Sequence, residues 1–206
     1  MQLFSNTPIQ TRFEESDEKI KSELNKISDD ELLSSDLEKI ADRIAQQYSI
    51  VCDTEFSTED VKVNSYLTLI PREALRPEQQ IGAIRSHYEF AAVDYTFKIN
   101  GDYTFFLNIP TNNSYQPIEG KVDMEKLTLI VITGYTTLPL SIKWEGRVKD
   151  AINNIVTEVK ARINTLKKEC EKRNANIKPR VLSILENEKK KIISKMEHDT
   201  NLNPFK

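Results

Sequence analysis

Apolar residues recur every three or four positions in the last third of the chain, a spacing typical of an amphipathic helix. They form a single stripe, which consists of Val148, Ile152, Ile155, Val159, Ile163 and Leu166. The polar residues 173–176 then predict a turn, and Pro179 suits the first turn of a following helix, where its missing N–H leaves no bond unmade. The pattern therefore predicts a long helical hairpin over residues 142–200, with the stripe in the core or at an interface.

Two shorter helices are expected near the N-terminus, within residues 13–49. Apolar positions at helical spacing run over residues 13–27 and 35–47. Ser28 and the acidic residues after it can cap one helix, and Asp36 or the serine before it can cap the next. Residues 1–12 are expected to form a flexible lead-in.

Alternation of apolar and polar residues predicts strands within residues 50–141, the expected antiparallel β core. It is clearest over residues 90–99, which an Asn-Gly pair follows. That pair predicts a hairpin to a strand over residues 103–109. Further strands are expected over residues 61–70 and, as an antiparallel pair, over residues 118–133.

These segments together predict an α+β fold. We expect N-terminal helices, an antiparallel β-sheet or sandwich core and a long C-terminal helical hairpin, all in one module. Residues 72–87 are polar and are expected to form a loop, and residues 201–206 are expected to form a tail.

Charge is distributed unevenly along the chain. Residues 1–60 carry 6 Lys/Arg against 15 Asp/Glu, whereas residues 142–206 carry 16 against 9. An acidic head and a basic tail suit self-association or an anionic partner. The preferred interpretation is simpler: the acidic helices fold against the basic hairpin.

The chain has 38% hydrophobic and 30% charged residues and no run of about 20 apolar residues, so no membrane partner is expected. Its N-terminus lacks the basic and apolar regions of a signal peptide, which predicts a cytoplasmic location. Cys52 and Cys170 lack the spacing of metal ligands and are expected to be buried thiols. The two histidines also lack such a spacing, and neither a metal nor a cofactor is predicted.

The order Asp102, Glu119, Lys121 gives the sharpest enzymatic hypothesis. A Mg²⁺-dependent nuclease uses two carboxylates to hold the metal and a lysine to stabilise charge near the attacked phosphate. However, a turn after the Asn-Gly pair favours a polar residue at position 102 in any case, and Gly120 weakens the strand beside it. A surface turn is the preferred interpretation, and a nuclease site is the alternative.

Lysines of the predicted hairpin form a second candidate site, a patch for an anion such as nucleic acid. The patch consists of Lys167, Lys168, Lys189, Lys190 and Lys191. Glutamates are interleaved with these lysines and no aromatic residue accompanies them, so a solvated helix face is preferred over a nucleic-acid site.

The order of segments resembles a sensor or scaffold module of bacterial proteins of predicted anti-phage defence. The similar stretches are IADRIAQQYSI (residues 40–50), VDYTFKINGDYTFFLNIPT (93–111), PIEGKVDMEKLTLIV (117–131) and NANIKPRVLSILENEKKKI (174–192). In that family the module precedes a separate effector, such as a TIR or restriction-endonuclease-like domain. The resemblance carries no catalytic motif, so it implies no functional residue.

The sequence and the resemblance together predict a non-enzymatic regulatory, oligomerisation or sensing module of a defence effector. The expected partners are an effector domain, fused or acting in trans, and further copies of the chain. A nucleic-acid-binding protein or Mg²⁺-dependent nuclease is the alternative.

Overall fold

β5 (His87–Asn100), which contains the strand predicted over residues 90–99, is the central strand of an antiparallel sheet. The computed structural model describes residues 2–74, 86–111 and 118–202. β4 (Lys62–Pro71) pairs along one side of β5, and β8 (Lys126–Ile132) pairs along the other. The remaining strands of this sheet are β7 (Ile118–Val122) beside β8, β1 (Gln2–Leu3) beside β7, and β3 (Glu55–Phe56) beside the end of β5.

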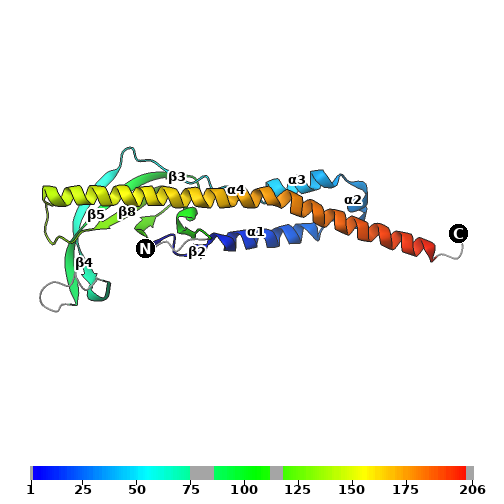
Figure 1. The fold of residues 1–206 in the computed structure, drawn as a ribbon, viewed down its shortest axis with the longest axis horizontal. Helices are drawn as coiled ribbons and strands as arrows, with labels where there is room; N and C mark the ends of the chain where they lie inside the picture. The colour runs from blue at the N-terminus through cyan, green and yellow to red at the C-terminus, as the bar shows by residue number, and fades with distance from the viewer. Residues whose placement is uncertain (1, 75–85, 112–117, 203–206) are drawn as a thin grey trace. The chain divides into compact units, whose positions relative to one another are not determined.

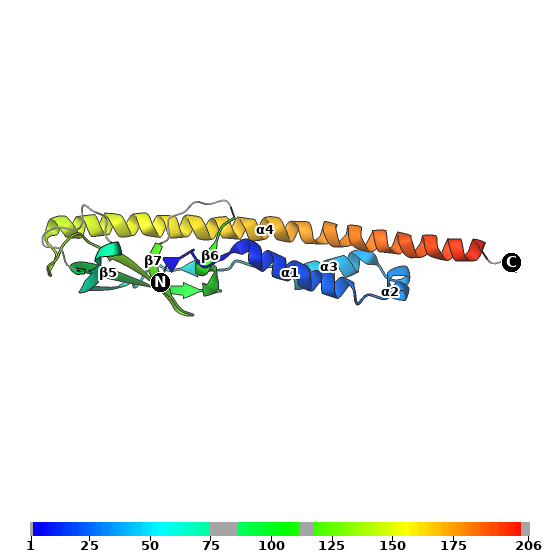
Figure 2. The same cartoon turned by 90° about the horizontal axis from the view of Figure 1, so that it is seen from below.

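The chain divides into two compact units. One comprises Met1–Thr7 and Cys52–Leu166, and the other comprises Pro8–Val51 and Lys167–Lys206. The first unit contains the sheet and the beginning of α4 (Ile142–Asn201), which lies along the sheet in Figure 1 and Figure 2. The second contains α1 (Ile9–Leu24), α2 (Asp29–Ser34), α3 (Leu37–Gln47) and the rest of α4.

The predicted fold class is confirmed: the protein is mixed α+β, with N-terminal helices, an antiparallel sheet and a long C-terminal helix. The turn predicted at residues 173–176 is absent, because α4 stays helical through Pro179 to Asn201. Instead of forming a turn, the polar side chains of Arg173 and Asn174 bind the segment that follows α3. The C-terminal half of α4 therefore packs against α1 and α3 rather than against its own first half.

The sheet and α4 bury the core of the first unit between them. The apolar side chains of one face of β5 and β8 are buried, among them Phe97, Leu127 and Leu129. The second unit has its own core, in which Ile20, Ile40 and Ile44 of the N-terminal helices pack against α4. The α4 residues in that core are Ile177, Val181 and Leu185.

Two segments differ from the sequence-based expectation. The strand expected over residues 103–109 is instead the 3₁₀ helix η3 (Tyr103–Leu107), followed by β6 (Asn108–Ile109). Asp102 caps this helix by accepting a hydrogen bond from the Thr104 N–H, and Phe105 and Phe106 are both buried, which one face of a strand would not allow.

Residues 1–12 were expected to be a lead-in without regular structure. They contain β1, β2 (Thr7–Pro8) and the start of α1, and Leu3 and Phe4 are buried in the first unit. The expected loop over residues 72–87 begins with the short helix η1 (Arg72–Ala74). Residues 75–85 of that loop and residues 203–206 of the expected tail lie outside the described residues.

The capping residues named from the sequence both cap a helix, although α2 lies between the two helices that were expected. Ser28 accepts a hydrogen bond from the Glu31 N–H at the start of α2, and Asp36 accepts hydrogen bonds from the first turn of α3. Within the described residues, no helix is long and apolar enough to span a membrane.

Candidate functional site

The structure does not bring the three residues of the nuclease hypothesis together. Lys121 pairs across the sheet with Thr128, which pairs with Thr96. The distance along β5 from Thr96 to Asn100 is about 13 Å at about 3.3 Å per residue, and Asp102 lies beyond that point. The Asp102 carboxylate accepts two hydrogen bonds from Thr104, one from its backbone N–H and one from its hydroxyl.

Glu119 lies two residues before Lys121 on β7 and is exposed, as the lysine is. Its carboxylate accepts a hydrogen bond from Gln2 Nε2 at 3.2 Å. Across residues 2–74, 86–111 and 118–202, no group of three or more His, Cys, Asp or Glu side chains is placed to hold a metal ion. The geometry thus gives no support to a nuclease site at these residues.

The apolar stripe predicted on the C-terminal helix lies inside the first unit. Ile155 is half-buried. The other members are buried, namely Val148, Ile152, Val159, Ile163 and Leu166. Cys52 and Cys170 are both buried, as expected. This stripe therefore belongs to an intramolecular core. A surface that binds another chain must consist of other residues.

Sequence reasoning missed Arg162, which is fully buried on α4 next to the stripe. Its guanidinium pairs with Glu158 one turn earlier and lies over the ring of Phe4, 5.3 Å from the ring centroid. These contacts place Arg162 in the packing of α4 against Phe4, the residue that follows β1.

The lysines of the predicted anion patch are spread along one continuous helical segment of α4. Lys167 and Lys189 are about 33 Å apart at the helical rise of about 1.5 Å per residue. Lys189 donates to the Leu33 carbonyl, and Lys191 pairs with Glu188. Lys168 and Lys190 are exposed. Because the hairpin turn is absent, these side chains do not form one patch.

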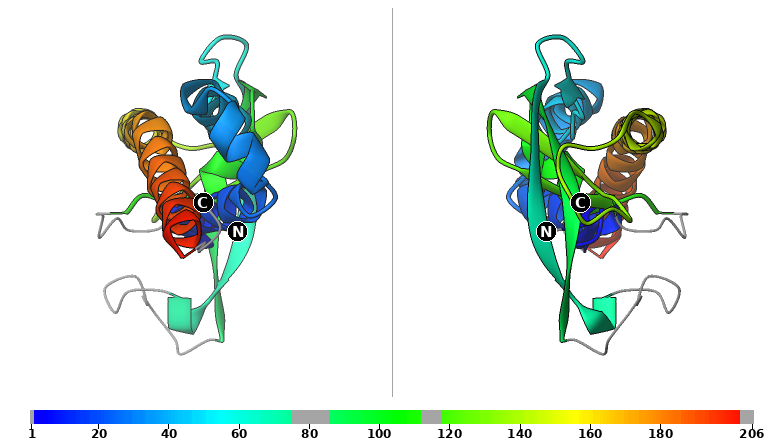
Figure 3. Two further views of the ribbon diagram at one scale, coloured as in Figure 1. Left: turned by 90° about the vertical axis from the view of Figure 1, so that its right-hand side faces the viewer. Right: turned by 90° about the vertical axis from the view of Figure 1, so that its left-hand side faces the viewer.

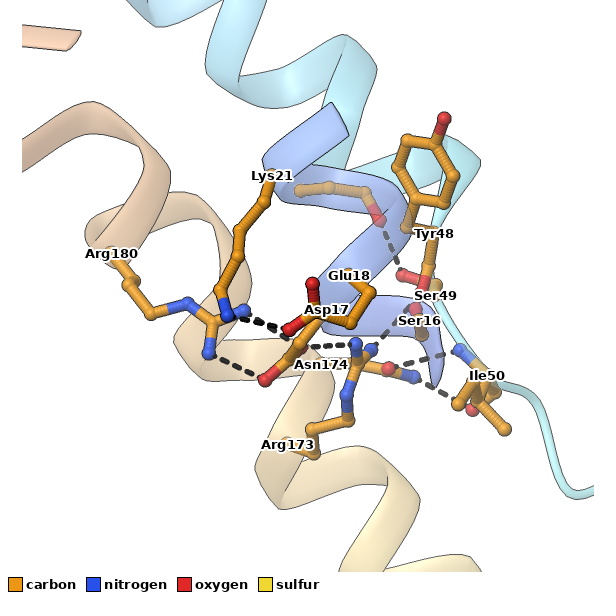
Figure 4. A network of polar contacts seen from close by, with 11 residues as sticks. Ser16, Asp17, Glu18, Lys21, Tyr48, Ser49, Ile50, Arg173, Asn174 and Arg180 are labelled. Atoms are coloured by element: carbon orange, nitrogen blue, oxygen red, sulfur yellow. Dashed lines mark hydrogen bonds and ion pairs between the residues drawn. The ribbon is translucent and has the colours of Figure 1, made fainter. Parts of the chain in front are cut away.

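An arginine–aspartate cluster joins α1 to α4 in the second unit (Figure 4). Arg180 donates to both carboxylate oxygens of Asp17, at 2.7 and 2.8 Å, and Arg173 donates to Asp17 Oδ1 at 2.8 Å. The hydrogen bond from Arg180 is the largest cause that lowers the pKa of Asp17, and the same bond raises the pKa of Arg180. Lys178 adds ion pairs to Glu38 and Asp42 of α3.

The same cluster fixes the chain that leaves α3. The side-chain amide of Asn174 accepts from the N–H of Ile50 and donates to its carbonyl, and Arg173 donates to the carbonyl of Tyr48 (Figure 4). Ser16 Oγ donates to that carbonyl too. These contacts within the second unit fit the simpler explanation of the charge gradient, in which acidic helices fold against a basic one.

The feature best suited to binding a macromolecule is the outer edge of β4. Within the described residues β4 pairs with β5 only and lies at the edge of the sheet (Figure 3). The backbone N–H and C=O groups on its other side therefore have no partner strand among these residues. One face of the strand also exposes three apolar side chains, with exposed fractions of 59% for Val63, 40% for Leu67 and 66% for Leu69. We call this strand, with these three side chains, the β4 edge.

The sequence predicts the strand but not that it is an edge. Val63, Leu67 and Leu69 alternate with polar residues in the way that half-buried strands do. Each of them lies on the same side of the sheet as its partner on β5, and for Val63 that partner is Tyr95. On that side Val93 and Phe97 of β5 and Leu129 of β8 are buried, whereas the three side chains of the β4 edge stay exposed.

Comparison of the chain with protein-family models, with curated proteins and with solved structures finds no match.

Proposed function

We propose that this chain is a non-enzymatic module that associates with a second copy of itself through the β4 edge. The observation that carries the proposal is the combination of open backbone hydrogen-bonding groups with an exposed apolar face on one strand. Strand edges of this kind pair with another chain, because main-chain hydrogen bonds supply affinity and alternate side chains supply specificity.

The β4 edge lacks the features by which proteins normally block such pairing. Lys62 at its start is the single charged residue of the strand, and Pro71 is its last residue. Between them the strand carries neither a charge nor a proline. Edge strands that remain unpaired usually carry inward-pointing charges, prolines or bulges.

The strand is also self-complementary when two copies run antiparallel about Tyr66. In that register Val63 of one copy lies opposite Leu69 of the other, so apolar side chains meet on the exposed face. Lys62 lies opposite Ile70 of the other copy, so no like charges face each other. Cross-strand apolar pairs contribute about 0.2–1 kcal/mol each, and like charges directly opposite destabilise a sheet.

Pairing of two modules would explain how the module could regulate an effector. Two effectors, whether fused to the module or bound to it, would be brought next to each other. The effector, the place in anti-phage defence and the cytoplasmic location are predictions that rest on the resemblance and on the sequence.

Sedimentation of the protein and of two variants tests the proposal. We expect the parent chain to be a dimer and Leu69→Lys to be a monomer, because the new lysine would lie opposite Val63 of the other copy, where it would be buried against apolar side chains. Ile142→Lys is the matched control, because it also places a lysine at an exposed apolar position, 88% exposed at the start of α4, but outside the β4 edge. A monomeric parent chain, or a dimer that Leu69→Lys leaves intact, would contradict the proposal.

A further inference from the structure

Four lysines from four neighbouring strands lie on the face of the sheet opposite the core. Residues that are paired across a sheet share a face, and so do residues two apart on one strand. Lys62 pairs with Thr96, Thr96 with Thr128, and Thr128 with Lys121, which places them in one row across the sheet. Lys98 and Lys126, two residues further along their strands, form the next row.

Lys98 of β5 lies directly opposite Lys126 of β8. Like charges in this position repel across about 5 Å and destabilise a sheet. Both side chains are exposed, and within the described parts of the chain none of the four lysines forms an ion pair with a carboxylate. The four lysines therefore concentrate positive charge on this face.

Polar groups suited to an anion lie between the lysines. The half-buried hydroxyls of Thr96 and Thr128 are 3.2 Å apart in the row between Lys62 and Lys121. A threonine hydroxyl can turn its hydrogen to an external acceptor, so the pair can donate to a bound oxyanion. The row spans three strand spacings, about 14 Å, which is wider than a single phosphate group.

An open hollow of about 540 Å³ lies beside these residues. Its lining includes Lys62, Lys98 and Lys126 together with the apolar side chain of Met124. Asp60 and Glu125 also line it, so its charge is mixed with a basic excess. Volumes of about 300–1,000 Å³ are typical of sites for small ligands and cofactors.

We propose that this face of the sheet binds a phosphate-bearing ligand of the size of a nucleotide. The lysines and the two threonine hydroxyls would hold the phosphates, and the hollow beside Met124 would accept the rest of the ligand. The repulsion between Lys98 and Lys126 gives the site its driving force, because a bound polyphosphate neutralises both. This inference is independent of the pairing through the β4 edge, which uses the backbone edge and the opposite face.

Fluorescence polarisation with a labelled nucleoside triphosphate tests the proposal, with unlabelled inorganic tripolyphosphate and a short single-stranded oligonucleotide as competitors. The double variant Lys98→Thr/Lys126→Thr removes the paired charges and keeps residues that favour strands. The double variant Lys167→Ala/Lys168→Ala is the control, because it removes two exposed lysines of α4 and changes the net charge equally.

We expect the nucleotide to bind and tripolyphosphate to displace it. The affinity for the nucleotide should fall at least about tenfold in Lys98→Thr/Lys126→Thr and stay unchanged in the control. The melting temperature of the strand variant should equal or exceed that of the parent chain, because it loses a like-charge pair. The proposal would be overturned if the nucleotide did not bind, or if both double variants lost affinity for it equally. Binding of the same oligonucleotide, when it carries the label instead, without binding of the nucleotide would overturn the assigned ligand size.

Discussion

Arg180 and Asp17 form a two-point ion pair in which two guanidinium nitrogens each donate to a different carboxylate oxygen. Paired planar groups of this kind give the strongest charge-assisted hydrogen bonds in proteins. Arg173 donates to the same carboxylate from one side, and its guanidinium also lies over the ring of Phe13, 5.6 Å from the ring centroid. One aspartate of α1 thus fixes two consecutive turns of α4.

Acid should therefore weaken the second unit through Asp17. The pKa of this carboxyl is lowered from its ordinary value of 3.8, first by the hydrogen bond from Arg180. A group whose pKa is lower in the folded state contributes stability that is complete above its ordinary pKa and is lost as the pH falls through the lowered value. We expect Asp17→Asn to cost about 1–3 kcal/mol at pH 7 and to flatten the loss of stability in acid.

Urea unfolding at a series of pH values from 7 to 2 measures both effects. Glu18→Gln is the control on the same helix, because Glu18 forms an exposed ion pair with Lys21 that contributes little. If Asp17→Asn and Glu18→Gln behaved alike over the whole pH range, the role given to the arginine–aspartate cluster would be wrong.

The turn between β5 and η3 requires a glycine at position 101, and substitution there tests this requirement. Gly101 has φ +82°, and a Cβ atom added there would lie 2.5 Å from the Asp53 carbonyl oxygen. We expect Gly101→Ala to destabilise the protein by at least about 1–2 kcal/mol, because a side chain strains this backbone conformation. Gly146→Ala is the matched comparison: nothing lies within 4 Å of its added Cβ, so the helix should gain about 0.5–1 kcal/mol. Thermal unfolding of both variants measures the two changes in stability, a loss for Gly101→Ala and a gain for Gly146→Ala.

A distance measurement within the second unit separates a continuous α4 from a hairpin. Spin labels at Lys168→Cys and Lys190→Cys, in a background with alanine at both native cysteines, should be separated by about 33 Å along a helix with a rise of about 1.5 Å per residue. A turn at residues 173–176 would bring the labels much closer together. Pulsed electron spin resonance gives the distance, and a short one would contradict the continuous helix.

Local patterns predicted much of the fold, because they depend on neighbours in the sequence. The alternation over residues 90–99 and the helix caps at Ser28 and Asp36 needed no tertiary knowledge. The turn at residues 173–176 was predicted from polarity alone. Arg173 and Asn174 are polar because they bind Asp17, Tyr48 and Ile50, partners more than 120 positions away that the local pattern does not reveal.

The candidate sites were harder to predict, because they depend on register and on strand order. Asp102, Glu119 and Lys121 had a suggestive order, but cross-strand pairing separates the first from the other two. The opposition of Lys98 and Lys126 follows only from the pairing of β5 with β8. The exposure of Leu69 follows only from the position of β4 at an edge.

Disulfide trapping at Tyr66 is the most direct test of self-association through the β4 edge. In the antiparallel pairing proposed here, residue 66 lies opposite its own copy, with Cα atoms about 4.5–5.5 Å apart, which suits a disulfide. In Lys62→Cys the new thiols would lie about 26 Å apart at about 3.3 Å per residue. We predict a covalent dimer of Tyr66→Cys under mild oxidation and none of Lys62→Cys. The absence of a covalent dimer of Tyr66→Cys, or equal cross-linking of both variants, would contradict the account.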